Sequence, residues 1–232
     1  MDMKYGDLLW AALFTAVVAF LTIPALQTVF VAATTARPYL MGFGKFALLA
    51  TMGELLALRI GAGSWRRPSA VPLRIIVWGV IGVVITFVFG FFSRGVSAAQ
   101  AAGALPFGAQ PSSLPGTIAA AFFTSTIMNL TFGPVLMTGH RLSDTWIDLR
   151  FGGRKPAEGD HRAGRRRRVS MAMVVDTVDW HTLVEFVLFR TIPFFWIPAH
   201  AITFLLPPEF RVIAAALLSV VLGGILAGTK RR

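Results

Sequence analysis

The chain contains no cysteine and few charged residues, and each shortage excludes a class of protein. Without cysteine the chain can form neither a disulfide framework nor a thiolate metal site. Charged residues make up only 14% of the 232 residues, whereas hydrophobic residues make up 55%. The mean hydropathy is +0.68. A soluble domain of this composition would expose a largely apolar surface, so the composition indicates an integral membrane protein.

The sequence also lacks the short motifs of common enzymes. It contains no H-E-x-x-H, no G-x-S-x-G and no G-x-x-x-x-G-K-[ST], which would have indicated a zinc protease, a serine hydrolase or a nucleotide-binding loop. His200 has no second histidine or carboxylate at ligand spacing on its predicted helix, and this argues against a metal site. We therefore expect no enzymatic activity, no cofactor and no metal.

Acidic residues are scarce as well, with 11 Asp and Glu against 22 Lys and Arg. The basic residues lie in clusters beside apolar runs, which is typical of topology signals rather than of a nucleic-acid surface. We expect the lipid bilayer, and no nucleic acid, as the partner of this chain.

Six apolar stretches are long enough to cross a hydrocarbon core of about 30 Å, which takes roughly 20 helical residues. They predict one all-α transmembrane domain over residues 1–232, a polytopic helical bundle of about six spans. The last two spans are separated only by Pro207, Pro208 and Glu209, and should form a hairpin. The spans are 8–32, 39–60, 73–92, 116–138, 183–206 and 210–228.

The basic residues fall on alternate loops, which predicts the orientation. One side receives Lys4, the cluster 59–67, nine basic residues over 141–168 and the C-terminal 230–232, whereas the other receives Arg37, Arg94 and Arg211. Both termini and the basic loop 139–181 should therefore face the cytoplasm, or the equivalent compartment of an organelle. The nearly uncharged loop 93–115 should lie outside, either as a plain loop or partly re-entrant.

The basic loop divides into two parts. Residues 141–150 place Leu142, Trp146 and Leu149 at helical spacing, so the fourth helix is expected to continue along the membrane surface with Trp146 at headgroup depth. Residues 152–168 form a basic segment expected to attract anionic lipid.

Small residues recur at four-residue spacing on two predicted spans, which lets helix backbones approach closely. Such faces predict a tight helical bundle. Association of this bundle into a homo-oligomer is left open. The residues are Gly82, Thr86 and Gly90 on the third span, and Ala215, Ser219, Gly223 and Ala227 on the sixth.

Two ionisable residues lie at matching depths inside the spans. Glu54 lies about 9 Å from the basic end of the second span at roughly 1.5 Å per residue, and Arg190 lies at a similar depth in the fifth. An unpaired charge there is costly, so we expect a Glu54–Arg190 ion pair, with Glu185 and Arg59 matched nearer the surface. The alternative is that Arg190 reaches the interface and Glu54 is protonated or bonded to backbone.

Nearer mid-membrane, the fourth span carries a polar stripe. Such a stripe either lines a water-filled path or joins helices by hydrogen bonds. Its members are Asn129 with Ser125 and Thr124 with Thr131, and Thr86, His200 and Thr203 could join them.

The C-terminal hairpin resembles the closing signature of the Mpv-type family of 22-kDa peroxisomal membrane proteins. The matching residues are a Trp-x-Pro, an aromatic residue near the helix end, a Pro and an Arg that opens the last helix: Trp196, Pro198, Phe204, Pro207 and Arg211. Gly53-Glu54 is similar to a Gly-acid pair of the family, and Gly133-Pro134 with His140 resembles its Gly-Pro-x-x-His element with a longer spacing. Thr203 and His200 replace the usual Asn and Gln, and six spans exceed the usual four.

The resemblance implies a small protein of an inner or organellar membrane, associated in some members with channel activity and metabolite or redox homeostasis. We accordingly expect a channel or transporter-like protein that passes an unknown small solute, in a bacterial inner membrane or alternatively an organellar one. Glu54, Asn129, Arg190 and His200 are the residues expected on the path. In the alternative, a non-conducting membrane scaffold or a stress or homeostasis protein, the same residues are structural.

Overall fold

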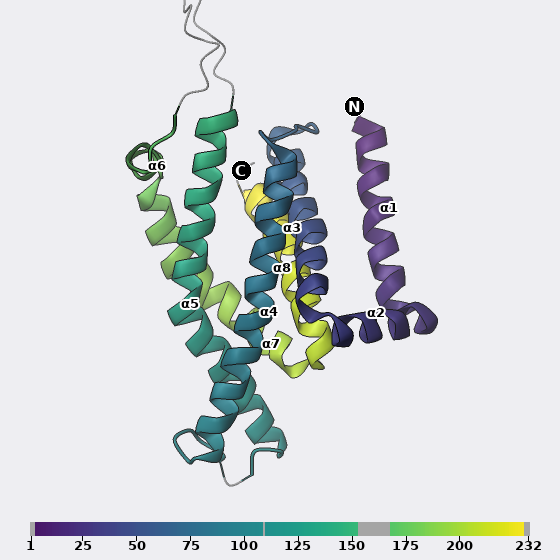
Figure 1. The fold of residues 1–232 in the computed structure, drawn as a ribbon, viewed down its shortest axis with the longest axis vertical. Helices are drawn as coiled ribbons and strands as arrows, with labels where there is room; N and C mark the ends of the chain where they lie inside the picture. The colour runs from purple at the N-terminus through teal and green to yellow at the C-terminus, as the bar shows by residue number, and fades with distance from the viewer. Residues whose placement is uncertain (1–2, 109, 153–167, 230–232) are drawn as a thin grey trace, which may run out of the picture.

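The protein is a bundle of helices, as the sequence predicts (Figure 1). The computed structural model describes residues 3–108, 110–152 and 168–229, and no β-strand occurs among them. The basic segment expected to attract anionic lipid lies almost entirely outside these described residues. The helices are α1 (Met3–Thr22), α2 (Pro24–Ala36), α3 (Pro38–Ala62), α4 (Val71–Ala101), α5 (Leu114–Phe151), α6 (Met171–Thr177), the π-helix η1 (Thr182–Trp196), α7 (Ile197–Leu205) and α8 (Pro208–Thr229).

The first predicted span, 8–32, is wrong as a single helix. Pro24 has no backbone N–H to continue α1, and Ile23 before it is extended, with φ −77° and ψ 119°. The chain therefore turns, and α2 runs crosswise to α1 at the lower end of that helix (Figure 1). Pro38 opens α3 in the same way, because proline is well suited to the first turn of a helix.

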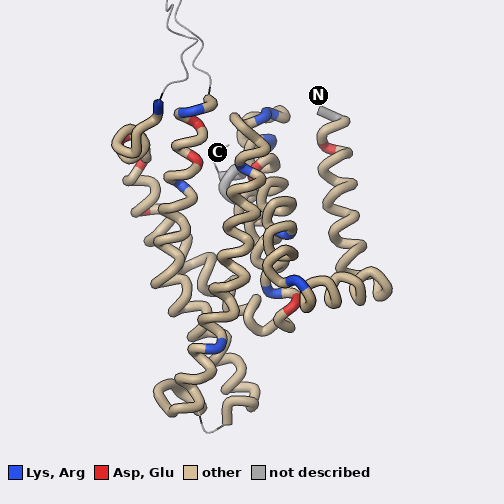
Figure 2. Tube along the Cα trace, viewed as in Figure 1, with Lys and Arg blue, Asp and Glu red and all other residues tan. Residues whose placement is uncertain are grey.

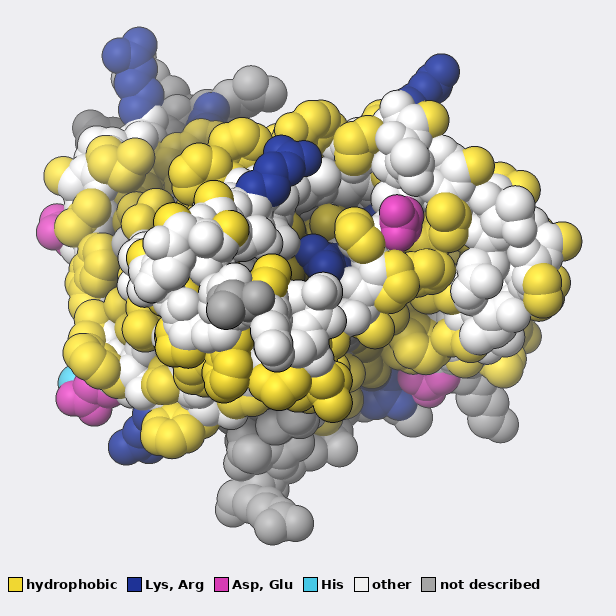
Figure 3. Space-filling view, turned by 90° about the horizontal axis from the view of Figure 1, so that it is seen from below, with side chains coloured by type: hydrophobic (Ala, Val, Ile, Leu, Met, Phe, Trp, Pro, Cys, Tyr) yellow, Lys and Arg dark blue, Asp and Glu magenta, His cyan; other side chains and the backbone are white. Residues whose placement is uncertain are grey.

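Five of the described helices are long and apolar enough to cross a membrane, which makes the chain an integral membrane protein. They are Tyr5–Thr22, Pro38–Ala62, Val71–Ala101, Leu114–Phe151 and the continuous Thr182–Leu205. The sixth predicted span, 210–228, is helical as α8, but its side chains from residue 225 onward lie outside the described part. Hydrophobic side chains surround the bundle when it is seen from below, as lipid contact requires (Figure 3).

The fourth span is longer than expected, and its extension is not a separate surface helix. Helix α5 continues without a break through 141–150 to Phe151 and stays in line with the bundle (Figure 1). Ile147 is 1% exposed, and Asp148 accepts hydrogen bonds from Arg74 and Ser69, so contacts with α4 and the connection before it hold this end upright. Trp146 is exposed, and its location at headgroup depth stays a prediction.

The predicted outer loop 93–115 is shorter, because α4 continues to Ala101. The connection that remains lies at the lower tip of the bundle and does not re-enter it (Figure 1). Gln100 ties it down, since its side-chain amide donates to the carbonyl oxygens of Pro106 and Gly116 at 3.1 Å each.

The start of α1, the end of α8, the end of α5 and the start of α6 all lie at one end of the bundle (Figure 1). Lys and Arg gather chiefly at this end, here called the basic end (Figure 2). Asp179 precedes η1 there and accepts hydrogen bonds from the backbone and the hydroxyl of Thr182, which hold the pKa of its carboxyl below the usual value. The arrangement agrees with the predicted placement of both termini on one side.

We expect the two ends of the bundle to face opposite compartments. Because the chain contains no cysteine, Ser97→Cys and Ser170→Cys each introduce a single labelling site, and both serines are exposed. In sealed inverted and right-side-out vesicles, an impermeant maleimide should label Cys at 97 from the outside and Cys at 170 from the cytoplasmic side. Labelling of both positions from the same side would refute this topology.

Glycine residues place α3 between α4 and α8 at close range. A side chain at Gly42 would meet Thr86 and the carbonyl of Gly82, whereas one at Gly53 would lie 3.0 Å from the Cα of Val220. The small-residue face of α8 thus packs against α3, not against α7 as the hairpin prediction implied. The hairpin itself forms, because α7 ends at Leu205 and α8 begins at Pro208.

Candidate functional site: a membrane cavity with two polar ends

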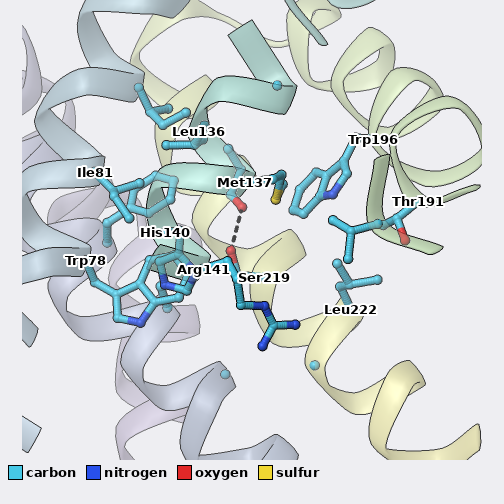
Figure 4. Close-up of a pocket in the computed structure, with 18 of the residues that line it drawn as sticks. Trp78, Ile81, Leu136, Met137, His140, Arg141, Thr191, Trp196, Ser219 and Leu222 are labelled. Carbon is cyan, nitrogen blue, oxygen red and sulfur yellow. Dashed lines mark hydrogen bonds between the residues drawn. The ribbon is translucent and has the colours of Figure 1, made fainter. Parts of the chain in front are cut away.

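A partly open cavity of about 460 Å³ lies between the helices of the bundle (Figure 4). Six elements contribute to its wall: α3, α4, α5, η1, α7 and α8. Most lining side chains are apolar, among them Phe46, Ile81, Phe132, Leu136 and Leu222. Polar side chains gather in two groups, one near mid-membrane and one near the basic end.

The mid-membrane group joins α5 to α7. His200 Nδ1 lies 3.1 Å from Asn129 Nδ2 and 3.2 Å from Asn129 Oδ1, and Asn129 Nδ2 also donates to the carbonyl of Ser125 at 2.8 Å. The Ser125 hydroxyl donates to the carbonyl of Ile197 at 2.7 Å, where η1 passes into α7. Asn129 and His200 are 4% and 6% exposed. These bonds satisfy polar groups that lipid would leave unpaired.

Trp196 covers one side of this group. Its indole ring stacks on the His200 ring with centroids 5.1 Å apart, while Phe89 meets the same imidazole edge-on at 5.5 Å. Trp196 ends the π-helical segment, in which Thr191 donates to the carbonyl of Phe186, five residues earlier. The segment is π-helical over 15 residues, much longer than the single π-helical turns that usually occur within α-helices, and it displaces its side chains from the α-helical register.

The group at the basic end is built around Arg74. Its side chain is only 7% exposed, and it donates to Glu54 Oε1 at 2.9 Å, to Asp144 Oδ1 at 3.0 Å and to Asp148 Oδ1 at 2.6 Å. The guanidinium thereby links α4 to carboxylates of α3 and α5. A buried guanidinium with several acceptors is far less costly than an unpaired one.

Trp78 and His140 complete the basic-end group. Trp78 Nε1 donates to Glu54 Oε2 at 3.0 Å, and its ring lies against the His140 ring with centroids 4.2 Å apart. His140 Nδ1 is 3.5 Å from Asp144 Oδ2. Arg141 also lines the cavity, is half-buried, and extends away from Trp78 and His140 (Figure 4).

The structure places three of the four predicted path residues on the cavity wall: Glu54, Asn129 and His200. Arg190 is exposed and does not line the cavity. The predicted Glu54–Arg190 pair is wrong, because Glu54 pairs with Arg74. Equal depth did not place the two side chains on facing sides of their helices.

The second predicted pair, Glu185 with Arg59, is also wrong. Arg59 binds Asp7 of α1 at 3.0 Å, whereas Glu185 lies 3.1 Å from His181, one turn earlier on its own chain. The Arg59–Asp7 pair, with Trp65 Nε1 donating to the same carboxylate at 2.9 Å, attaches α1 to the rest of the bundle.

The polar stripe divides between hydrogen bonding across helices and backbone contacts within one helix. Ser125, Asn129 and His200 form one network, as predicted. Thr131 is exposed and bonds the carbonyl of Ile127. Thr86 and Thr203 likewise bond carbonyls one turn earlier, those of Gly82 and Ala199. The stripe is therefore not one continuous polar path.

The signature residues near the C-terminus lie in two places, the cavity wall and the turn between α7 and α8. Arg211 Nε donates to the carbonyl of Leu206 at 2.9 Å, and its guanidinium lies over the Phe204 ring at 5.6 Å. Pro207 accepts from Phe210 N at 3.0 Å within the turn. Phe204, Pro207 and Arg211 thus shape the turn, whereas Trp196, with Pro198 after it in the first turn of α7, shapes the cavity.

Sequence reasoning missed five residues of the basic-end group: Arg74, Trp78, His140, Arg141 and Asp144. Arg74 carried a usable signal, because it lies just inside the predicted third span at its basic end, at a depth similar to that of Glu54. Trp78 lies inside the predicted third span and was not singled out, whereas His140, Arg141 and Asp144 were assigned to the basic loop, because the fourth span was expected to end before them.

No group of His, Asp and Glu that could hold a metal occurs among residues 3–108, 110–152 and 168–229. The fold and the cavity define the class of protein: an all-α integral membrane protein with an internal, mainly apolar cavity. Comparison of the chain with protein-family models, with curated proteins and with solved structures finds no match. The assignment of function therefore rests on the site itself.

Proposed function

We propose that this membrane protein binds a small solute in the internal cavity and passes it across the membrane. The observation that carries the proposal is the cavity of about 460 Å³ between six helical elements. Sites for small molecules commonly have volumes of roughly 300–1,000 Å³, with apolar walls and a few polar groups that orient the ligand. The two polar groups of this cavity fit that description.

A transporter-like mechanism is favoured over an open aqueous channel. An open aqueous channel selects its ions through rings of polar or charged groups, whereas apolar side chains such as Ile85, Met128 and Phe132 make up much of the wall here. A solute would leave this cavity through a change in helix packing. The non-α-helical stretch η1 and its junction with α7 at Trp196 form one wall, and are the natural place for such a change.

One observation favours the alternative, a non-conducting scaffold or homeostasis protein. Glu54, Asn129 and His200 all have partners within the protein, so each of them also stabilises the bundle. Transport therefore has to be measured directly rather than inferred from their polarity.

The resemblance of the C-terminal hairpin supports membership of the Mpv-type family, and we include that membership in the proposal. Trp196, Phe204 and Arg211 have separate roles in cavity and turn, which gives the signature a physical purpose. The corresponding location is a bacterial inner membrane, with an organellar membrane as the alternative. Membrane fractionation of the source cells would test this part.

Purified protein in liposomes should release small trapped solutes faster than empty liposomes do. Met137→Trp should lower the release about tenfold, because the larger side chain occupies part of the cavity, and an added barrier of about 1.4 kcal/mol slows passage tenfold. Met137 lines the cavity, whereas Val135 on the same helix is 65% exposed to the outside. Val135→Trp is therefore the matched control and should leave release unchanged. A panel of neutral, anionic and cationic solutes measured by dequenching or radiolabel provides the readout.

Release at the level of empty liposomes for every solute would favour the scaffold. Equal release by the wild type, Met137→Trp and Val135→Trp would show that solute passes outside this cavity. Thermal stability of both variants in detergent identifies a loss of release that is due to misfolding.

A further inference from the structure

One cationic side chain of the cavity wall has no hydrogen-bonded partner in the described part of the chain. Arg141 lines the cavity near its basic end and is half-buried. Its guanidinium donates no hydrogen bond to any residue within 3–108, 110–152 and 168–229, and forms no ion pair there. A half-buried guanidinium with no hydrogen-bond acceptor among the described residues keeps its five N–H donors available to a ligand.

The carboxylates on the same wall are already engaged. Glu54 accepts from Arg74 through one oxygen and from Trp78 through the other. Asp144 meets Arg74 through Oδ1 and His140 through Oδ2. A cationic ligand would have to displace these donors, whereas an anionic ligand would find the Arg141 donors unused.

The rest of the space beside Arg141 is apolar. Met137 and Leu222 lie nearest to it, and Leu136 and the indole of Trp196 lie farther along the cavity wall (Figure 4). A ligand that fills the cavity therefore needs an apolar body, and burial of each methylene should tighten binding by about fourfold.

We propose that the cavity binds a small amphipathic carboxylate, with the carboxylate at the Arg141 guanidinium and the apolar chain along the Leu136–Trp196 wall. This inference rests on the proposed function, because it names the class of solute for the same cavity. A guanidinium can hold both oxygens of a carboxylate at once, which gives the site its preference for this headgroup.

Binding of octanoate, octanamide and octylammonium to wild-type protein in lipid nanodiscs tests the headgroup. Equilibrium dialysis of radiolabelled probe, with subtraction of empty nanodiscs, separates binding from partition into lipid. We expect octanoate to bind about tenfold more tightly than octanamide, because the bond to a charged group is the stronger one. Butanoate should bind about 250-fold more weakly than octanoate, since it buries four fewer methylenes at about fourfold each.

Arg141→Gln should lower octanoate affinity to that of octanamide and leave octanamide binding unchanged. Arg67→Gln is the matched control, because Arg67 is exposed near the same end of the bundle and does not line the cavity. The headgroup series on the wild type tests the proposal independently of how either variant folds. Tighter binding of octylammonium than of octanoate, or octanoate binding that is indifferent to Arg141→Gln, would overturn it.

The two proposals fail in different ways. Solute release from liposomes without a headgroup preference in binding would refute the carboxylate ligand and retain transport. Octanoate binding that depends on Arg141, in a protein that releases no solute, would retain the ligand site and refute transport.

Discussion

Arg74→Gln should destabilise the protein by about 3–5 kcal/mol, the usual cost of removing one partner of a buried ion pair. Arg74 is 7% exposed on its side chain and bonds three carboxylates, those of Glu54, Asp144 and Asp148. Without the guanidinium, the carboxylates of Glu54 and Asp144, which both line the cavity, would repel each other in a medium of low dielectric constant. The free energy of unfolding, measured in mixed micelles with increasing SDS fraction, should show the loss.

A double-mutant cycle isolates the Arg74–Glu54 interaction from the separate contribution of each residue. Glu54→Gln alone should destabilise the protein, and the double variant should lose less than the sum of the two single losses. Arg190→Gln serves as control, because Arg190 is exposed and Glu54 does not pair with it. Its effect should add to that of Glu54→Gln. Strict additivity for Arg74 and non-additivity for Arg190 would restore the ion pair expected from depth alone.

Gly223→Leu should destabilise the protein by about 1–3 kcal/mol, the range expected for overpacking. A Cβ at residue 223 would lie 2.9 Å from the carbonyl oxygen of Gly53, so a larger side chain must separate α8 from α3. The neighbouring Gly224 is the matched control, because a Cβ there meets nothing within 4 Å. Gly224→Leu should leave stability nearly unchanged in the same unfolding assay.

The same pair of variants tests which face of α8 is packed. Greater loss from Gly224→Leu than from Gly223→Leu would mean that α8 is rotated about its axis. The Glu54 side of the cavity would then need a different wall, because Gly53 and Gly223 both line it.

Much of the fold could be predicted because it depends on local order along the chain. Apolar stretches of sufficient length predict membrane helices, and alternating basic loops predict which ends lie together. Pro208 indicated the start of the last helix for the same local reason. The break at Pro24 was predictable by this rule too, but the apolar stretch around it was read as one span.

The ends of α4 and α5 were harder, because sequence polarity competes with tertiary contact. Residues 141–150 resemble a surface helix in isolation, with charges opposite an apolar edge. In the bundle, Arg74 bonds two of those charges, Asp144 and Asp148, and the helix remains in line. A charge next to a partner is no longer a signal that the chain has left the membrane.

The sequence by itself therefore determined the all-α fold class, the central parts of the membrane helices and the grouping of the termini at one end. It also identified Glu54, Asn129 and His200 as polar residues that line the cavity. Only the tertiary structure decided their partners, because a pairing depends on the rotation of each helix about its axis as well as on depth. Glu54 met Arg74, 20 residues along the chain, and Arg190 faced outward. The cavity likewise exists only where six elements meet, so Arg141 became part of a site through packing alone.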